Sequence, residues 1–153
     1  MLDITLVAFG KIKEKHYEAV CQEYVRRLKP YARLKIIELE AVSFSASNKL
    51  AVQQQEAKKV KVLLDKYPDH QVVLWDEAGE SFTSLTWAKK LVKINRPLLL
   101  VIGGTLGFAP EIKQSYTRWS LSPLTMPHEL ARVVLMEQLY RAATIIQGKE
   151  YHY

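Results

Sequence analysis

The stretch Leu98-Leu99-Leu100-Val101-Ile102-Gly103-Gly104-Thr105-Leu106-Gly107 decides how the rest of the sequence is interpreted. Five consecutive apolar residues that end at a glycine are typical of a short strand buried on both faces of a parallel sheet. Such a strand delivers the loop after it to the carboxyl edge of the sheet, where open α/β sheets bind their ligands. Glycines there supply positive φ or let a ligand approach the backbone. We therefore expect a ligand at Gly103 to Gly107, with a plain strand-to-helix turn as the alternative.

The spacing of the glycines argues against a phosphate-bearing ligand. Gly103-Gly104-x-x-Gly107 is neither the dinucleotide fingerprint G-x-G-x-x-G nor a P-loop. Pro110 suits the first turn of a following helix, and Glu111 then places a carboxylate at the positive end of that helix. A phosphate would be repelled by this carboxylate, so we expect a ligand without phosphate.

The composition is that of one globular domain, residues 1–153, with 48% hydrophobic residues. No apolar run approaches the roughly 18 residues of a membrane span, and the first ten residues lack a secretory pattern, so we expect a cytoplasmic protein without a membrane partner. The single cysteine, Cys21, excludes an internal disulfide and a cysteine-based zinc cluster. The net charge of +6 suits a polyanionic partner, although a moderate charge also serves solubility.

Strand patterns and helix patterns alternate along the chain. The strand patterns lie at residues 3–9, 34–39, 71–75, 98–102 and 118–121. The helix patterns lie at residues 14–28, 49–67, 110–116 and 127–147, with one more after a cap at Thr83 or Ser84. This order predicts an α/β fold with a mainly parallel sheet and helices on both faces. Asp76 to Gly79 is expected to turn the chain after the third strand.

Lysines near two of these elements have two interpretations. Lys11, Lys13 and Lys15 follow the first strand, and they form either a phosphate-contacting lip beside the glycine loop or a solvated loop. The second helix is basic, and its lysines are either a solvated face or a surface that rests against phosphates. The side of this helix that we expect to be buried carries Leu50, Ala57, Val60, Leu64 and Tyr67.

The helix from Pro127 to Gln147 is apolar around almost its whole circumference. If a helix of this kind packs on a sheet through one side, its other side is also apolar and must be buried by another element. In a short chain the simplest cover is a second copy of the same helix. We therefore expect a homodimer with this helix in the interface.

The polar residues of this helix are few. Glu137 and Arg141 are four residues apart and can pair. Arg132 projects toward the apolar side, either as part of an interchain salt bridge or to grip a substrate. His128-Glu129 begins like a zinc-binding H-E-x-x-H helix, but the fifth residue is Arg132, so that interpretation fails. The other histidines show no ligand spacing either, and we expect no metal.

Several motifs in this order closely resemble the RlmH family, small SPOUT-class methyltransferases that methylate N3 of a pseudouridine in 23S ribosomal RNA. In the second half of the chain they are Ile102-Gly103-Gly104-x-x-Gly107, Trp119-Ser120-Leu121-Ser122, Thr125-x-Pro127-His128, Arg132-Val133, Glu137-Gln138-x-Tyr140-Arg141-Ala142 and Tyr151-His152. Leu6-Val7-Ala8-x-Gly10 and Glu23-Tyr24-x-x-Arg27 extend the likeness toward the first residues. The resemblance therefore covers the whole length.

The resemblance implies a dimeric α/β fold with a C-terminal trefoil knot that holds S-adenosylmethionine, and 23S rRNA or the ribosome as partner. It places the cofactor at the end of the third strand, at the glycine loop and along the segment before the last helix. The residues concerned are Trp75, Gly103, Gly104, Gly107, Leu121, Ser122, Pro123, Leu124, Thr125 and Met126. Trp75 is bulkier than the aliphatic residue expected at its position.

The implied reaction requires an imide nitrogen to lose its proton, so a base or a cation that stabilises the anion is needed. We nominate Arg132 and Arg141 for this electrostatic role and Glu137 to orient them. His128, Tyr151 and His152 are weaker candidates for proton handling or base stacking, and some of the six can come from the partner chain.

Two alternatives remain open. One is a noncatalytic dimeric RNA-binding or ribosome-associated protein, and the other is a SPOUT methyltransferase that acts on a different RNA base.

Overall fold

A computed structural model describes residues 1–45 and 47–153. The strands are β1 (Leu2–Phe9), β2 (Ala32–Leu39), β3 (Gln71–Ser81), β4 (Leu98–Ile102) and β5 (Thr117–Ser120). The helices are α1 (Lys15–Leu28), α2 (Lys49–Leu64), α3 (Ser84–Lys93), α4 (Pro110–Ser115) and α5 (His128–Ile146). Strands and helices alternate as the sequence predicts.

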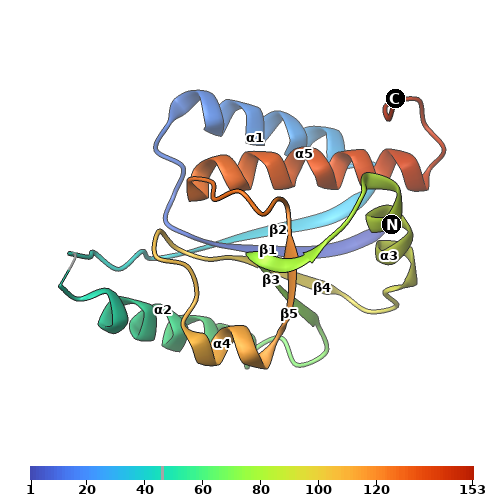
Figure 1. The fold of residues 1–153 in the computed structure, drawn as a ribbon. Coiled ribbons are helices and arrows are strands. Elements are labelled where there is room, and N and C mark those ends of the chain that lie inside the picture. The colour runs from blue at the N-terminus through green and yellow to red at the C-terminus, as the bar shows by residue number, and fades with distance from the viewer. Residues whose placement is uncertain (46) are drawn as a thin grey trace.

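The strands form one parallel sheet in the order β2-β1-β4-β3-β5 (Figure 1). The apolar run Leu98–Ile102 is the central strand, between β1 and β3, and all five of its residues are buried. A central parallel strand is covered on both faces, which explains why this run carries no polar residue. The prediction drawn from the apolar run is confirmed.

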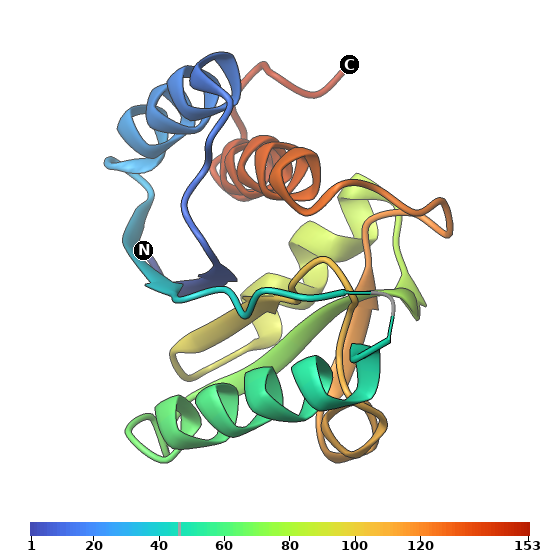
Figure 2. The same ribbon diagram turned by 90° about the vertical axis from the view of Figure 1, so that its left-hand side faces the viewer.

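Helices cover both faces of the sheet (Figure 2). α1, α3 and α5 pack on one face, and α2 and α4 pack on the other. Successive side chains of a strand point to opposite faces, so β4 contributes Leu98, Leu100 and Ile102 to the first core and Leu99 and Val101 to the second. The sheet therefore supports two separate hydrophobic cores.

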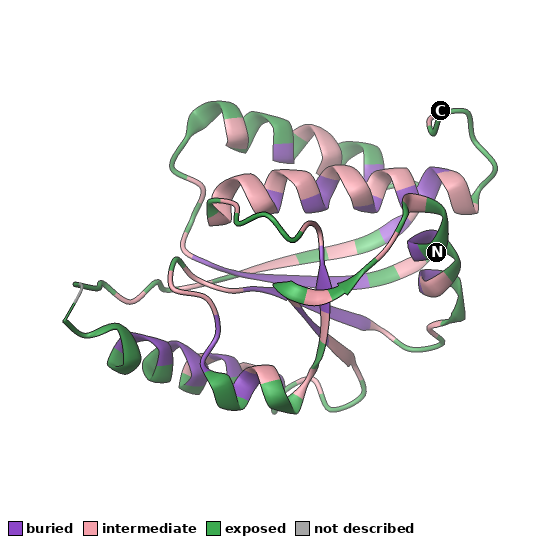
Figure 3. Ribbon diagram, viewed as in Figure 1, coloured by how far each residue is buried: buried purple, intermediate pink, exposed green. Residues whose placement is uncertain are grey.

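The last helix, α5, lies between α1 and α3 over the sheet. No residue from His128 to Ile146 is fully exposed (Figure 3). Part of the second cover that the sequence argument assigned to a partner chain is thus provided by α1 and α3. The homodimer remains a prediction.

The prediction of a turn at Asp76 to Gly79 is wrong, because β3 continues through these residues to Ser81. Trp75 and Glu80 both pair with Trp119, so the residues between them form a bulge in the β3–β5 ladder.

The bulge is organised by the buried carboxylate of Asp76. Asp76 accepts a hydrogen bond from the Ala78 backbone N–H at 3.1 Å, and Lys113 Nζ and Arg118 Nη1 each lie 3.3 Å from its Oδ2. Burial by itself raises the pKa of Asp76, but the Ala78 hydrogen bond and the two cations outweigh it and hold the pKa below its usual value. The ionised side chain therefore ties α4 and β5 to β3.

Gly79 permits the close approach of β3 and β5 at the bulge. A Cβ atom on Gly79 would lie 2.7 Å from the carbonyl carbons of Arg118 and Trp119, which are backbone atoms that cannot move aside. We predict that Gly79→Ala lowers the free energy of unfolding by about 1–3 kcal/mol through overpacking. Urea denaturation measures the change, with Ala78→Ser at the neighbouring exposed position as the control. Equal stability of Gly79→Ala and the wild type would contradict the close contact.

Candidate active site

Three neighbouring strands are aligned at one place near the carboxyl edge of the sheet. Trp75 of β3 pairs with Ile102 of β4 on one side and with Trp119 of β5 on the other. The chain therefore leaves β4 at Gly103 and β5 at Leu121 on either side of the β3 main chain. This arrangement brings together the three regions to which the resemblance assigned the cofactor.

The glycine loop after β4 is a tight turn. Gly107 has φ +70°, which favours glycine, and its N–H donates to the Gly104 carbonyl at 3.0 Å. A Cβ on Gly103 would lie 3.3 Å from the Phe108 ring, and one on Gly104 would lie 2.5 Å from Glu56 Oε2. A side chain at Gly103 or Gly104 would therefore displace the Phe108 ring or the Glu56 carboxylate.

Two polar residues of α2 lie against this loop, and neither was expected from the sequence. Gln53 Nε2 donates to the Leu106 carbonyl at 2.8 Å, and Glu56 lies against Gly104. Both are buried, whereas Leu50, expected on the buried side, is 69% exposed. The buried stripe of α2 thus includes two polar residues among Val52, Ala57 and Val60. The sequence does contain a signal for this: Gln53 and Glu56 are three residues apart and so lie on the same apolar face of the helix.

Trp75 contributes its main chain to this edge and its indole to the core. The indole makes T-shaped contacts with Trp87 and Trp119 at centroid distances of 5.6 and 5.9 Å. These distances are typical of stabilising aromatic pairs. The bulk of Trp75 is therefore accommodated within the aromatic cluster.

The segment from Leu121 to Met126 lies beside the β3 bulge. Thr125 Oγ1 donates to Glu77 Oε2 at 2.6 Å, and Leu124 N donates to Ser122 Oγ at 3.0 Å. Leu121, Ser122 and Met126 are half-buried, while Pro123, Leu124 and Thr125 are exposed. Leu124, at 75% exposed, is an apolar side chain that a ligand could cover.

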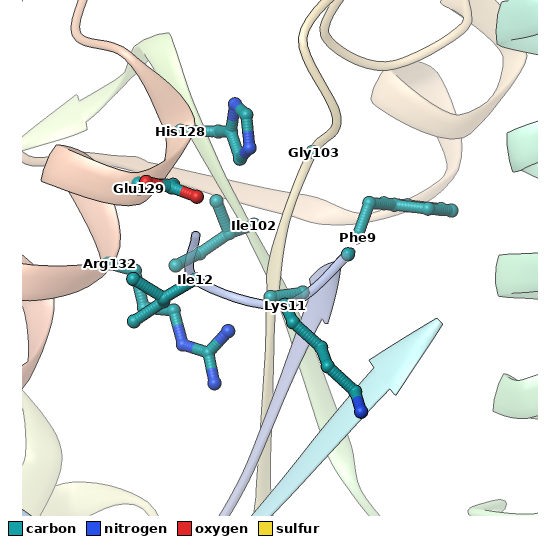
Figure 4. Close-up of a pocket in the computed structure, with 10 residues that line it drawn as sticks. Phe9, Lys11, Ile12, Ile102, Gly103, His128, Glu129 and Arg132 are labelled. Atoms are coloured by element: carbon teal, nitrogen blue, oxygen red, sulfur yellow. The ribbon is translucent and has the colours of Figure 1, made fainter. Parts of the chain in front are cut away.

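The first turns of α5 meet the ends of β1 and β4 around a small hollow (Figure 4). His128, Glu129 and Arg132 of α5 line it together with Gly103 and Ile12, and its volume is about 10 Å³. That is no more room than one water molecule needs. Glu129 accepts a hydrogen bond from the Lys13 backbone N–H at 2.6 Å and so fixes the chain before α1.

Arg132 is 7% exposed and pairs with Glu38 of its own chain, Nη2 to Oε1, at 2.7 Å. The structure thus supplies an intrachain partner where sequence analysis had offered an interchain salt bridge. The Nε atom of Arg132 is buried without a hydrogen-bond partner among the described residues. A buried donor without a partner is costly, so this guanidinium has capacity for a further acceptor.

The second group of nominated residues surrounds Glu137 in the second half of α5. Arg141 binds Glu137 Oε1 through Nε at 3.0 Å and Nη2 at 2.6 Å, as the spacing predicts, and Tyr151 Oη donates to the same oxygen at 3.1 Å. The Arg141 guanidinium lies 4.8 Å from the centroid of the Tyr151 ring, and its Nη1 is 3.4 Å from His152 Nδ1. The tail thus folds back onto α5, although Tyr153 is fully exposed.

This environment fixes the protonation state of Tyr151. Burial, the hydrogen bond with Tyr24 and the charge of Glu137 all raise the pKa of Tyr151 well above its usual value. Tyr151 therefore stays protonated near neutral pH and acts as a hydrogen-bond donor. The Glu137 hydrogen bond likewise raises the pKa of Arg141, which stays charged.

The six nominated catalytic residues lie in two separate groups within one chain. His128 and Arg132 are at the carboxyl edge, and Arg141 lies thirteen residues beyond His128, about 20 Å along the helix axis. Glu137, Tyr151 and His152 belong with Arg141. Within one chain the two groups therefore lie at different positions along α5.

Residues 1–45 and 47–153 contain no group of three or more His, Cys, Asp or Glu side chains placed to hold a metal ion. No helix in the same residues is long and apolar enough to cross a membrane.

Comparison with known proteins gives consistent matches over the full length. A family described as "Predicted SPOUT methyltransferase" matches residues 2–152. The ribosomal RNA large subunit methyltransferase H of Gloeobacter violaceus is 42% identical, over 98% of both chains. The protein of the same name from Ruminiclostridium cellulolyticum is 38% identical, over 99% of both.

A solved structure also resembles the fold. It is a probable methylase family protein from Haemophilus influenzae Rd KW20, with a TM-score of 0.61 at 14% identity, over 100% of this chain and 72% of that one. At this identity the likeness shows the fold alone.

Proposed function

The chain belongs to the SPOUT methyltransferase family, and we propose that it uses S-adenosylmethionine to methylate N3 of a pseudouridine in 23S rRNA. The names of its full-length relatives support rRNA of the large subunit as substrate. The observation that carries the proposal is the meeting of the glycine loop, Trp75 of β3 and the segment from Leu121 at one edge of the sheet. The proposal includes the trefoil knot implied by the resemblance and a place in the cytoplasm.

The residues at this edge fit S-adenosylmethionine. This cofactor carries no phosphate, in keeping with Glu111 in the first turn of α4. Its adenine needs apolar cover and backbone hydrogen bonds, which Leu121, Leu124 and Met126 beside the backbone of Gly103 and Gly104 can provide. When bound, S-adenosylmethionine supplies a methyl group on a positively charged sulfur.

A dimer can bring the two groups of nominated residues into one site. An antiparallel pairing of α5 with its copy would place Arg141, Tyr151 and His152 of one chain near the glycine loop, His128 and Arg132 of the other. Leu130, Val134 and Ile145 of α5 are only half-buried and would gain cover in such a pairing. The active site of this proposal is therefore composite.

Each side chain in this composite site has a separate role. Arg132, with one buried donor free, and Arg141, held by Glu137, stabilise the negative charge on the base as the N3 proton leaves. Tyr151 stays neutral and fixes Glu137, so it does not serve as the base. His128 at the start of α5 lies beside Gly103 and is free to interact with substrate.

We predict that purified protein binds S-adenosylmethionine in calorimetry and transfers labelled methyl into large ribosomal subunits from a strain that lacks the gene. Arg132→Ala should lower the transfer rate at least a hundredfold, because it removes about 3 kcal/mol of charge stabilisation. The nucleotide that carries the label should be a pseudouridine of 23S rRNA.

Three results would contradict this proposal. Absence of donor binding by a folded protein would favour a noncatalytic ribosome-associated protein. Label in a different RNA base would favour another SPOUT methyltransferase activity. Wild-type rates for Arg132→Ala would remove Arg132 from the site.

A mixed-dimer experiment tests the composite site. Arg132→Ala and Arg141→Ala should each be inactive as purified dimers, yet co-expressed chains should recover roughly one quarter of wild-type activity, because half of the dimers are mixed and each mixed dimer has one intact site. Mixing two preparations of Arg132→Ala serves as the control. If mixed dimers stay inactive, both arginines act within the same chain.

A further inference from the structure

A second hollow opens beside the glycine loop, on the side facing α2. Phe44 of the β2–α2 connection, Val52 and Glu56 of α2, and the backbone of Gly104 to Leu106 line it, and its volume is about 150 Å³. A cavity of about 150 Å³ in another protein holds one benzene ring. The hollow thus has room for one planar ring and is too small for the whole of S-adenosylmethionine.

One wall of this hollow carries a buried carboxylate with spare hydrogen-bonding capacity. Glu56 is 6% exposed, and its Oε2 has no hydrogen-bond partner among the described residues. The nearby Lys59 Nζ instead donates to the Glu40 carbonyl at 2.8 Å. Burial, opposed by the Val42 backbone and by Lys59, raises the pKa of Glu56. A buried acceptor of this kind is costly unless a ligand donates to it.

The rim of the hollow carries an aromatic ring and two cations. Phe44 is 50% exposed, and Lys11 and Lys13 at the exit from β1 are exposed. An exposed aromatic ring next to lysines is the combination by which proteins hold a single nucleotide, with the base stacked and the phosphates neutralised. His128 also lines this hollow, which therefore adjoins the hollow of Figure 4.

We propose that this hollow receives the target base of the RNA substrate, with Phe44 stacked on the base and Glu56 accepting one of its ring N–H groups. Lys11 and Lys13 contact the flanking phosphates. The inference rests on the proposed function and deepens it, because it names the groups that hold the target base.

The chemistry of Glu56 selects a class of base. Pseudouridine carries two ring N–H donors, whereas the pairing-edge ring nitrogens of cytosine and adenine are acceptors and would repel the carboxylate. A base must leave its stack to enter such a hollow. It would then lie against Gly104, which is part of the loop assigned to the methyl donor.

Four variants test this assignment by methyl transfer into large ribosomal subunits. Glu56→Gln and Phe44→Ala should each lower kcat/KM for the subunit at least tenfold, because one loses a charged acceptor and the other a stacking surface. The matched controls are Glu40→Gln, at an exposed glutamate, and Val62→Ala, at an exposed position of α2. Both controls should stay within twofold of the wild type. Wild-type kinetics for Glu56→Gln or Phe44→Ala would overturn the proposal.

Donor affinity separates base recognition from a structural role of Glu56. Because Glu56 touches Gly104, a merely structural defect would also weaken S-adenosylmethionine binding. Our proposal predicts a donor dissociation constant within twofold of the wild type for Glu56→Gln, measured by calorimetry. A loss of donor binding equal to the loss of kcat/KM would assign Glu56 to support of the loop instead.

Photocrosslinking tests the base site without catalysis. Large subunits whose rRNA carries 4-thiouridine should crosslink wild-type protein within the tryptic peptide of residues 36–49, which contains Phe44. If the protein forms this crosslink but transfers no methyl group, the base site is supported and the proposed function is contradicted. Crosslinks confined to peptides that contain no residue lining the hollow would overturn the site.

Discussion

The constraint on which the structure depends is the burial of Leu98–Ile102 on both faces of a parallel sheet. Because β4 is central and apolar throughout, no ligand can reach the strand itself. The first part of this segment that a ligand can approach is the loop that begins at Gly103. The register then aligns Ile102, Trp75 and Trp119, so the chain leaves β4 and β5 on either side of β3, close to Trp75. The proposed ligand site follows from strand pairing before any catalytic side chain is considered.

The loops at this edge are held by polar contacts that lie outside the sheet. Asp76 ties α4 and β5 to the bulge of β3, and Glu77 holds Thr125. On the opposite side, Gln53 of α2 donates to the Leu106 carbonyl of the glycine loop, and Glu56 lies against Gly104. Each of these residues lies where a regular pattern is interrupted. Asp76 and Glu77 are in the bulge of β3, and Gln53 and Glu56 are polar residues on an apolar helix face. Such deviations are expected where a fold carries function.

Much of the fold could be predicted from the sequence, because the apolar run of β4 and the alternation of elements are local patterns. The Glu137–Arg141 pair was also accessible, since it depends only on helical spacing. The extension of β3 past Asp76 was not, because it requires cations from α4 and β5 that are distant in sequence. For the same reason the pairing of Arg132 with Glu38 escaped prediction.

The central claim is that the glycine loop and the segment before α5 together hold the methyl donor. Hydrogen exchange with and without S-adenosylmethionine tests it most directly, because bound ligand slows exchange of the amides that it covers. The account predicts slower exchange at both residues 103–107 and residues 121–126. Slower exchange in only one of these segments, or at the hollow of about 250 Å³ near Met1 and Arg96 on the opposite edge of the sheet, would contradict it.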